Sequence, residues 1–84
     1  RGEGSSARVR ADRAVAMVAG NALAEIGTTC LSAEDIDGAR QAWVEAHDEY
    51  RRAAAPKHAR RVVFMLGELD ALDERTRSAV DEHM

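Results

Sequence analysis

Residues 33–54 read AEDIDGARQAWVEAHDEYRRAA and carry the clearest structural pattern of the chain. Their apolar side chains recur at steps of three or four residues, at Ile36, Ala39, Trp43, Ala46, Tyr50 and Ala53. This spacing places them on one face of an α-helix. The single tryptophan and the single tyrosine of the chain both lie on this stripe. The stretch therefore predicts an amphipathic helix, from Ala33 to about Ala54, that packs against other helices.

Both ends of this helix have sequence signals. Ser32 is the expected N-cap, with Asp35 as an acidic variant of the capping box three residues later. Arg51 and Arg52 fall in the last turn, where the helix dipole favours positive charge. Pro56 then ends the helix and suits the first position of the next one.

A helix is expected on each side of this central one. The first covers residues 7–31, and Val15, Val18, Ala19, Ala22, Leu23, Ile26 and Cys30 share its broad apolar face. Gly20 marks a close-packing point or a bend. Gly27 either caps the end of the helix or lies inside it where two helices touch, and the second is favoured because Cys30 and Leu31 continue the apolar face. The third covers residues 56–72, with a stripe formed by Ala59, Val62, Val63, Leu66, Leu69 and Leu72. Asp73 either caps a short fourth helix over 74–83 or belongs to an extension of the third.

The fold class expected from these patterns is all-α, with an antiparallel helical hairpin and one or two further helices. No stretch alternates apolar and polar residues as a strand would. Eighty-four residues suffice for one domain. We expect a disordered tail over 1–6, because RGEGSS has no apolar anchor, and a single helical domain over 7–84. Since the chain begins at Arg1, we also expect it to be part of a longer protein.

Composition narrows the class of protein further. The single cysteine allows no internal disulfide, which favours a cytoplasmic location. No uninterrupted apolar run approaches the ~20 residues that span a bilayer, so no membrane partner is expected. Aromatic residues are only 4% of the chain. A core rich in alanine buries little area per residue, which favours association with another chain or with a second copy.

Residues 23–50 resemble a tetratricopeptide repeat, a helical hairpin of 34 residues. Leu23, Ile26, Gly27 and Cys30 fall at the packing positions of its first helix, and Ile36, Ala39, Trp43 and Ala46 fall at those of its second. The stretch from Asp35 to Trp43, with Tyr50 and Pro56, is similar to the last repeat and trailing helix of repeat arrays in actinobacterial regulators. Only this one repeat is legible.

The resemblance implies a module that binds a protein or peptide and performs no chemistry. The partner-binding surface that it implies is lined by Asn21, Ala24, Thr28 and Leu31. No lysine or arginine falls on these first-helix positions, which argues against a ligand held by its carboxylate. The resemblance also implies neighbouring repeats, because one repeat leaves its faces uncovered.

Charge is unevenly distributed along the predicted helices. Antiparallel helices would bring eight cationic residues to one end, here called the basic pole: Arg8, Arg10, Arg13, Arg51, Arg52, Lys57, Arg60 and Arg61. The opposite end would be acidic, with Glu34, Asp35, Asp37, Glu68, Asp70, Asp73 and Glu74. The net charge of −3 therefore hides a dipolar molecule. A basic pole suits nucleic acid or an acidic partner, although no recognition-helix motif accompanies it.

Residues capable of catalysis or metal binding are few and scattered. His47, His58 and His83 lack a second metal ligand at helical spacing, so we expect no metal site. Cys30 has no histidine near it in sequence, which favours an inert thiol. No catalytic residue and no cofactor are expected. The predicted function is a non-catalytic protein–protein interaction or oligomerisation module of a cytoplasmic regulatory protein. The alternatives are a nucleic-acid-associated protein and a stand-alone helical homodimer.

Overall fold

A computed structural model describes the backbone of residues 2–83 and the side chains of residues 7–80. It contains three helices: α1 (Gly2–Ser32), α2 (Ile36–Arg52) and α3 (Pro56–His83). Among the described residues there is no strand, which confirms the all-α class and the helical hairpin. The helices are joined by two short turns, at residues 33–35 and 53–55.

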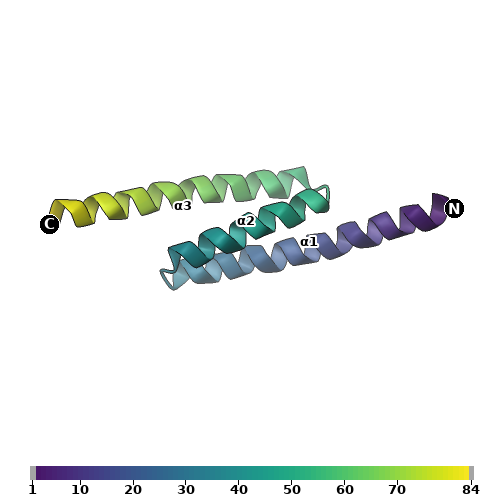
Figure 1. Cartoon of the computed structure of the whole chain (residues 1–84), viewed down its shortest axis with the longest axis horizontal. Helices are drawn as coiled ribbons and strands as arrows, with labels where there is room; N and C mark the ends of the chain where they lie inside the picture. The colour runs from purple at the N-terminus through teal and green to yellow at the C-terminus, as the bar shows by residue number, and fades with distance from the viewer. Residues whose placement is uncertain (1, 84) are drawn as a thin grey trace.

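Helix α2 lies in the middle of the molecule, with α1 and α3 on either side of it (Figure 1). Each turn reverses the chain, so α1 and α3 run in the same direction and α2 runs opposite to both. The expected stripe of α2 faces its neighbours, since Ala39, Trp43, Ala46 and Tyr50 are all buried. The other members of the core are Ala16 of α1, Ala42 of α2, and Ala59, Val62 and Leu69 of α3.

The two outer helices are longer than the helix between them. Helix α1 has 31 residues and α3 has 28, whereas α2 has 17. At about 1.5 Å per residue, α1 exceeds α2 by about 20 Å. The excess lies at opposite ends of the molecule, at the N-terminal part of α1 and the C-terminal part of α3 (Figure 1). These two segments, residues 2–15 of α1 and 74–83 of α3, extend past the ends of α2, and we call them overhangs.

The helix boundaries correct two predictions. Helix α1 begins at Gly2, so residues 2–6 are helical where a disordered tail over 1–6 was expected; Arg1 lies outside the described residues. Once a helix has formed, each residue added to its end gains one backbone hydrogen bond, so α1 continues from Ala7 toward the N-terminus. Helix α2 begins at Ile36 and ends at Arg52, inside the expected 33–54.

The N-cap of α2 is Asp35, so the prediction of Ser32 was wrong. Ser32 is still part of α1, because that helix ends in a Schellman turn that uses the next three residues. In this turn the N–H of Asp35 donates to the Cys30 carbonyl at 2.8 Å, and Glu34 takes a left-handed conformation with φ 63°. The Asp35 carboxylate then accepts from the backbone N–H of Gly38 at 3.0 Å.

The second turn repeats this geometry and starts α3 at Pro56 as predicted. Ala54 has φ 54°, and the N–H of Ala55 donates to the Tyr50 carbonyl at 2.9 Å. Helix α3 continues without a break through Asp73 to His83, so there is no separate fourth helix over 74–83 among the described residues. The Asp73 carboxylate pairs with arginines instead of capping a helix.

The apolar face of α1 differs from the predicted one. The residues against α2 are small, with Ala16, Gly20 and Gly27 buried. Small residues are selected here because the two aromatic rings of α2 occupy the space beside α1. Three of the larger residues assigned to this face are turned outward, since Val15, Val18 and Ile26 are 68%, 69% and 51% exposed. Leu23 and Cys30 are partly buried against the core as expected.

Candidate interaction groove

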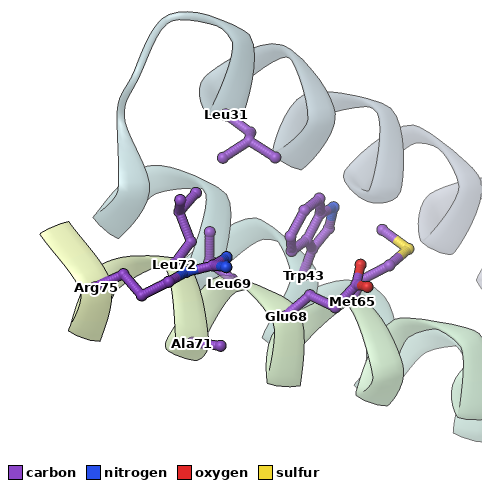
Figure 2. Close-up of a pocket in the computed structure, with 8 residues that line it drawn as sticks. All are labelled: Leu31, Trp43, Met65, Glu68, Leu69, Ala71, Leu72 and Arg75. Carbon is purple, nitrogen blue, oxygen red and sulfur yellow. The ribbon is translucent and has the colours of Figure 1, made fainter.

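An open groove of about 430 Å³ lies between α1 and α3, above α2. All three helices contribute to it, with Leu31 from α1, Trp43 from α2, and Met65, Leu69 and Leu72 from α3. In Figure 2 the Leu31 side chain lies across from the α3 side chains, with the Trp43 ring between them. Glu68 and Arg75 add charge along the α3 side. The groove is therefore an apolar channel with a charged margin.

Trp43 is fixed at the base of this groove. Trp43 is only 4% exposed, and its indole N–H donates to the Ala24 carbonyl of α1 at 3.1 Å. Gly27 provides the space for the ring, since a Cβ there would overlap the indole. The hydrogen bond and the tight packing hold the ring in one position, so it forms a rigid apolar surface.

A second depression of about 180 Å³ continues the groove toward the other end of α2. Tyr50 and Met65 line it, and Met65 also lines the first depression. The Tyr50 hydroxyl donates to the Asn21 Oδ1 at 2.7 Å, and its ring lies 5.1 Å from that of His58. Burial raises the pKa of the Tyr50 hydroxyl, against the smaller opposing effect of the Arg61 charge.

Three of the four predicted partner-binding residues line this groove. Leu31 lines the first depression, and Ala24 and Thr28 line the second. Asn21 lines neither depression; it is exposed and accepts the hydrogen bond from Tyr50. Trp43 and Tyr50, which the sequence places on the stripe that packs against other helices, are both buried and also border the groove.

The contribution of α3 was missed, because only one repeat was legible in the sequence. His58, Arg61 and Arg75 lie along the groove. A ligand held by its carboxylate was not expected, because none of the four predicted α1 positions is a lysine or arginine. With α3 in place the groove has two arginines, one in each depression. The only sequence signal for them was their position on the α3 helix beside Val62 and Leu72.

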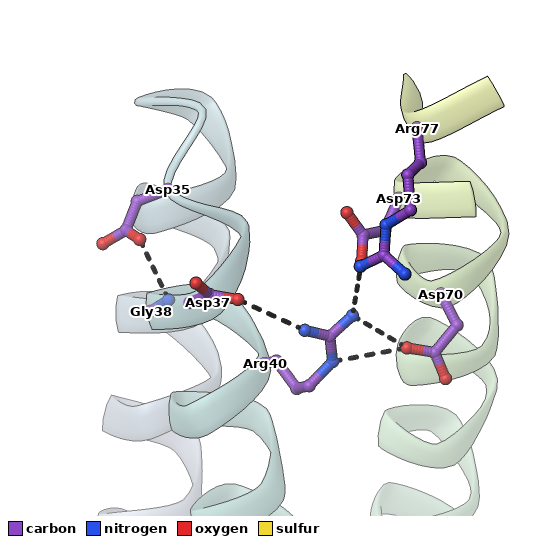
Figure 3. Close-up of polar contacts among 7 residues, drawn as sticks. All are labelled: Asp35, Asp37, Gly38, Arg40, Asp70, Asp73 and Arg77. Carbon is purple, nitrogen blue, oxygen red and sulfur yellow. Dashed lines mark hydrogen bonds and ion pairs between the residues drawn. The ribbon is translucent and has the colours of Figure 1, made fainter. Parts of the chain in front are cut away.

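Polar side chains fasten α2 to α3 at one end of the molecule (Figure 3). Arg40 of α2 donates to Asp70 of α3 through Nε at 3.3 Å and Nη2 at 3.0 Å. It also lies within 3.5 Å of Asp73 and 3.4 Å of Asp37. Hydrogen bonding to Asp70 raises the pKa of Arg40. Arg77 pairs with Asp73 at 3.4 Å. Sequence reasoning missed Arg40, since its partner is 30 residues away.

The end of α2 and the start of α3, two of the three segments of the predicted basic pole, meet at one turn that lies beside α1, whereas α1 begins farther out (Figure 1). The pole is more spread out than predicted, because Arg8, Arg10 and Arg13 lie on the α1 overhang. Arg52 is bonded to Glu49 within α2 at 2.6 Å. At the other end, Arg40 and Arg77 offset part of the predicted acidic charge.

The described residues offer no cluster for metal chemistry. Among them, no group of three or more histidine, cysteine, aspartate or glutamate side chains is placed to hold a metal ion. His47 is half-buried and lies 3.9 Å from the Asp48 carboxylate, and Cys30 is a half-buried free thiol. His83 lies at the end of α3, where side chains are not described.

Helix α1 is apolar over much of its length, more than its lack of a long uninterrupted apolar run indicates. Although no apolar run is uninterrupted, Ala7–Ser32 is long and apolar enough to cross a membrane by length and composition alone. Its most apolar window has a mean hydropathy of 1.4, and 17% of that window is buried. Helices of this length and composition occur as core helices of soluble proteins and as signal sequences as well as in membranes.

Comparison with known proteins adds no relative. No protein-family model, no curated protein and no solved structure matches this chain.

Proposed function

We propose that this chain is a non-catalytic protein-interaction module of a cytoplasmic regulatory protein, and that it binds an amphipathic helix in the groove above Trp43. The observation that carries the proposal is the apolar groove itself, to which all three helices contribute. Its open apolar channel and charged margin suit a partner helix with one apolar face, a recurring mode of peptide recognition.

The dimensions of the groove support a helical ligand. Along α3 it extends from His58 to Arg75, which corresponds to about 25 Å of helix. Apolar anchors at steps of three, four and seven residues on a partner helix would meet the accessible apolar side chains of the groove, Leu31, Met65 and Leu72. The arginines at 61 and 75 and the glutamates at 25 and 68 are placed to set its direction.

The tetratricopeptide-like interpretation is supported by the contact between Gly27 and Trp43, which is the close approach expected inside such a hairpin. It is opposed by helix length. A repeat of 34 residues has two helices, whereas α1 alone has 31 residues and α3 has 28. The proposal of a helix-binding groove does not depend on this resemblance.

The test is a selection of displayed amphipathic helical peptides on the immobilised protein, followed by titration of the selected peptides. We expect the selection to converge on apolar residues at helical spacing. Leu72→Glu, on the groove margin, should weaken binding at least tenfold. Val63→Glu, at an exposed α3 position outside both depressions, should leave binding unchanged. Failure to enrich any helix, or equal binding to both variants, would contradict the proposal.

A second candidate, binding to nucleic acid, is favoured by the part of the basic pole that gathers where α2 ends and α3 begins. It predicts affinity for labelled DNA or RNA duplexes that falls steeply between about 50 and 200 mM salt. Arg51→Glu with Arg60→Glu should abolish such binding. Arg75→Glu with Arg77→Glu makes the same charge change at the opposite end and should retain most of it. Equal losses in both pairs would indicate a nonspecific charge effect.

A further inference from the structure

The outer face of α1, opposite α2, is apolar and uncovered. Val15, Val18, Ala22 and Ile26 follow one another at steps of three, four and four residues and are all exposed. Val15, Val18 and Ile26 are more than half exposed. We call these four residues the outer stripe. The α2-facing side of the same helix contains Gly20 and Gly27, so α1 has two apolar faces, of which only one is used within the chain.

We propose that the outer stripe is the contact for a second copy of this chain, packed antiparallel along α1. The stripe is self-complementary about the midpoint between Gly20 and Asn21. An antiparallel copy places Val15 opposite Ile26 and brings Val18 beside Ala22 at the centre of the contact. Each large side chain at the centre thus meets a small one. Such contacts allow two helices to approach to about 8–10 Å between their axes.

Charge complementarity favours the antiparallel direction. Arg8, Arg10 and Arg13 lie on the overhang at one end of α1, and the other end leads into a turn with Glu34 and Asp35. In an antiparallel pair, Arg8 of each copy lies opposite residue 33 of the other, beside those carboxylates. A parallel pair would instead place the three arginines of both copies together. Among the described side chains, none of these arginines has an ion-pair partner within the chain.

The overhang of α1 gains a neighbour in this arrangement. Its residues extend past the end of α2, and an antiparallel copy would pack the last turns of its own α1 against them. One pair of helices buries less than the ~800 Å² per partner of a standard interface. We therefore expect a dimer that dissociates on dilution, not an obligate one.

A bilayer is a poorer occupant of the same face. Helix α2 packs along α1 and carries exposed Glu45 and Asp48. If α1 spanned a membrane with α2 attached, these carboxylates would enter the hydrocarbon, where charged side chains are costly. A second copy covers the outer stripe and leaves α2 in water.

The experiment compares molar mass by light scattering across a concentration series. Wild type should shift from monomer to dimer, and Val18→Glu should remain monomeric. Val63→Glu, the same substitution at an exposed position of α3, should dimerise like wild type. Circular dichroism of both variants checks that the helices are retained. A monomeric wild type at high concentration, or a dimer that survives Val18→Glu, would overturn the proposal.

The direction of packing has its own test, in a Cys30→Ser background. Val15→Cys and Ile26→Cys proteins are mixed and oxidised, and the products are resolved by mass. Antiparallel packing predicts a mixed 15–26 disulfide in excess over either homodimer, whereas excess homodimers would indicate parallel packing and overturn the proposed direction. Flotation with anionic vesicles tests the other occupant: binding of wild type that Val18→Glu abolishes, without a dimer in solution, would assign the stripe to lipid. Leu72→Glu should dimerise normally, so this proposal and the groove proposal can fail separately.

Discussion

Gly27 of α1 lies against the indole ring of Trp43 of α2, so closely that a single methyl group at position 27 would overlap the ring. The neighbouring Ala24 carbonyl accepts the indole N–H. Gly20, seven residues earlier in α1, has the same relationship to Tyr50, since a Cβ at Gly20 would lie 2.7 Å from Cε1 of the Tyr50 ring. The hairpin is therefore built from two aromatic rings on α2 and two glycines on α1 that accommodate them.

This relationship predicts that Gly27→Ala destabilises the protein, although alanine is the better helix former. Overpacking costs typically 1–3 kcal/mol, and the overlap with a buried ring puts Gly27→Ala in the upper part of this range, about 2–3 kcal/mol. Against a gain of about 1 kcal/mol in helix propensity, we expect a net loss of about 1–2 kcal/mol. Urea unfolding followed by Trp43 fluorescence measures it. Gly67→Ala is the matched control, because no atom lies within 4 Å of a Cβ built there. It should stabilise by about 1 kcal/mol, and a similar effect at both glycines would argue against the close contact.

The left-handed residues of the two turns predict a stabilising substitution. Ala54 has φ 54°, a conformation that costs an L-residue about 1–2 kcal/mol and costs glycine little. Ala54→Gly should therefore raise the free energy of unfolding by about 1 kcal/mol. The adjacent Ala53 has φ −77°, and Ala53→Gly should lower stability instead. Thermal unfolding of both variants decides the point, since opposite signs are expected at neighbouring alanines.

The ion pairs of Arg40 predict a salt-dependent link between α2 and α3. Arg40→Gln should lower the urea midpoint at low ionic strength, because Asp70 and Asp73 of α3 lose their partner on α2. The difference from wild type should shrink in 1 M salt, which screens exposed charges. Arg52→Gln breaks an ion pair within α2 and is the control. An effect of Arg40→Gln that is independent of salt would assign its role to packing.

Local sequence patterns predicted most of the helices and little of what they contact. The stripe from Ile36 to Tyr50 specified α2 and its buried face, and Pro56 specified the start of α3. Ser32 has the chemistry of an N-cap, but a Schellman turn follows it. That turn, like the second one, needs a residue in the left-handed conformation, and neither Glu34 nor Ala54 is a residue type that predicts it. Likewise, Val18 was assigned to the buried face of α1 because it is hydrophobic. Hydrophobicity does not show that the two aromatic rings of α2 require glycines, and that the glycine side of α1 is therefore the buried one.

The groove could be predicted only in part for the same reason. Ala24, Thr28 and Leu31, which line the groove, were among the four residues expected from the resemblance of residues 23–50 to a helical hairpin repeat, whereas Asn21, the fourth, lines neither depression. The α3 side of the groove follows from a pairing of helices whose contacts are distant in sequence, and no local pattern encodes which side of α2 it will occupy.

Tyr50 makes stability depend on pH in the alkaline range. Burial raises its pKa in the folded protein above the value of about 10 in the unfolded chain. Below pH 10 the hydroxyl is protonated in both states, so its contribution is constant. As pH rises past 10 the unfolded chain loses this proton first, and the free energy of unfolding should fall.

The single tyrosine allows this to be measured directly, because absorbance near 295 nm reports Tyr50 alone. The titration midpoint should lie above 10 in the native protein and move further upward in Arg61→Ala, which removes the opposing charge. Tyr50→Phe should lose about 1 kcal/mol at neutral pH with the hydrogen bond to Asn21. Its stability should also fall less than that of wild type between pH 9 and 11. A native midpoint at or below 10 would show that the ring is not held in its buried position against Gly20.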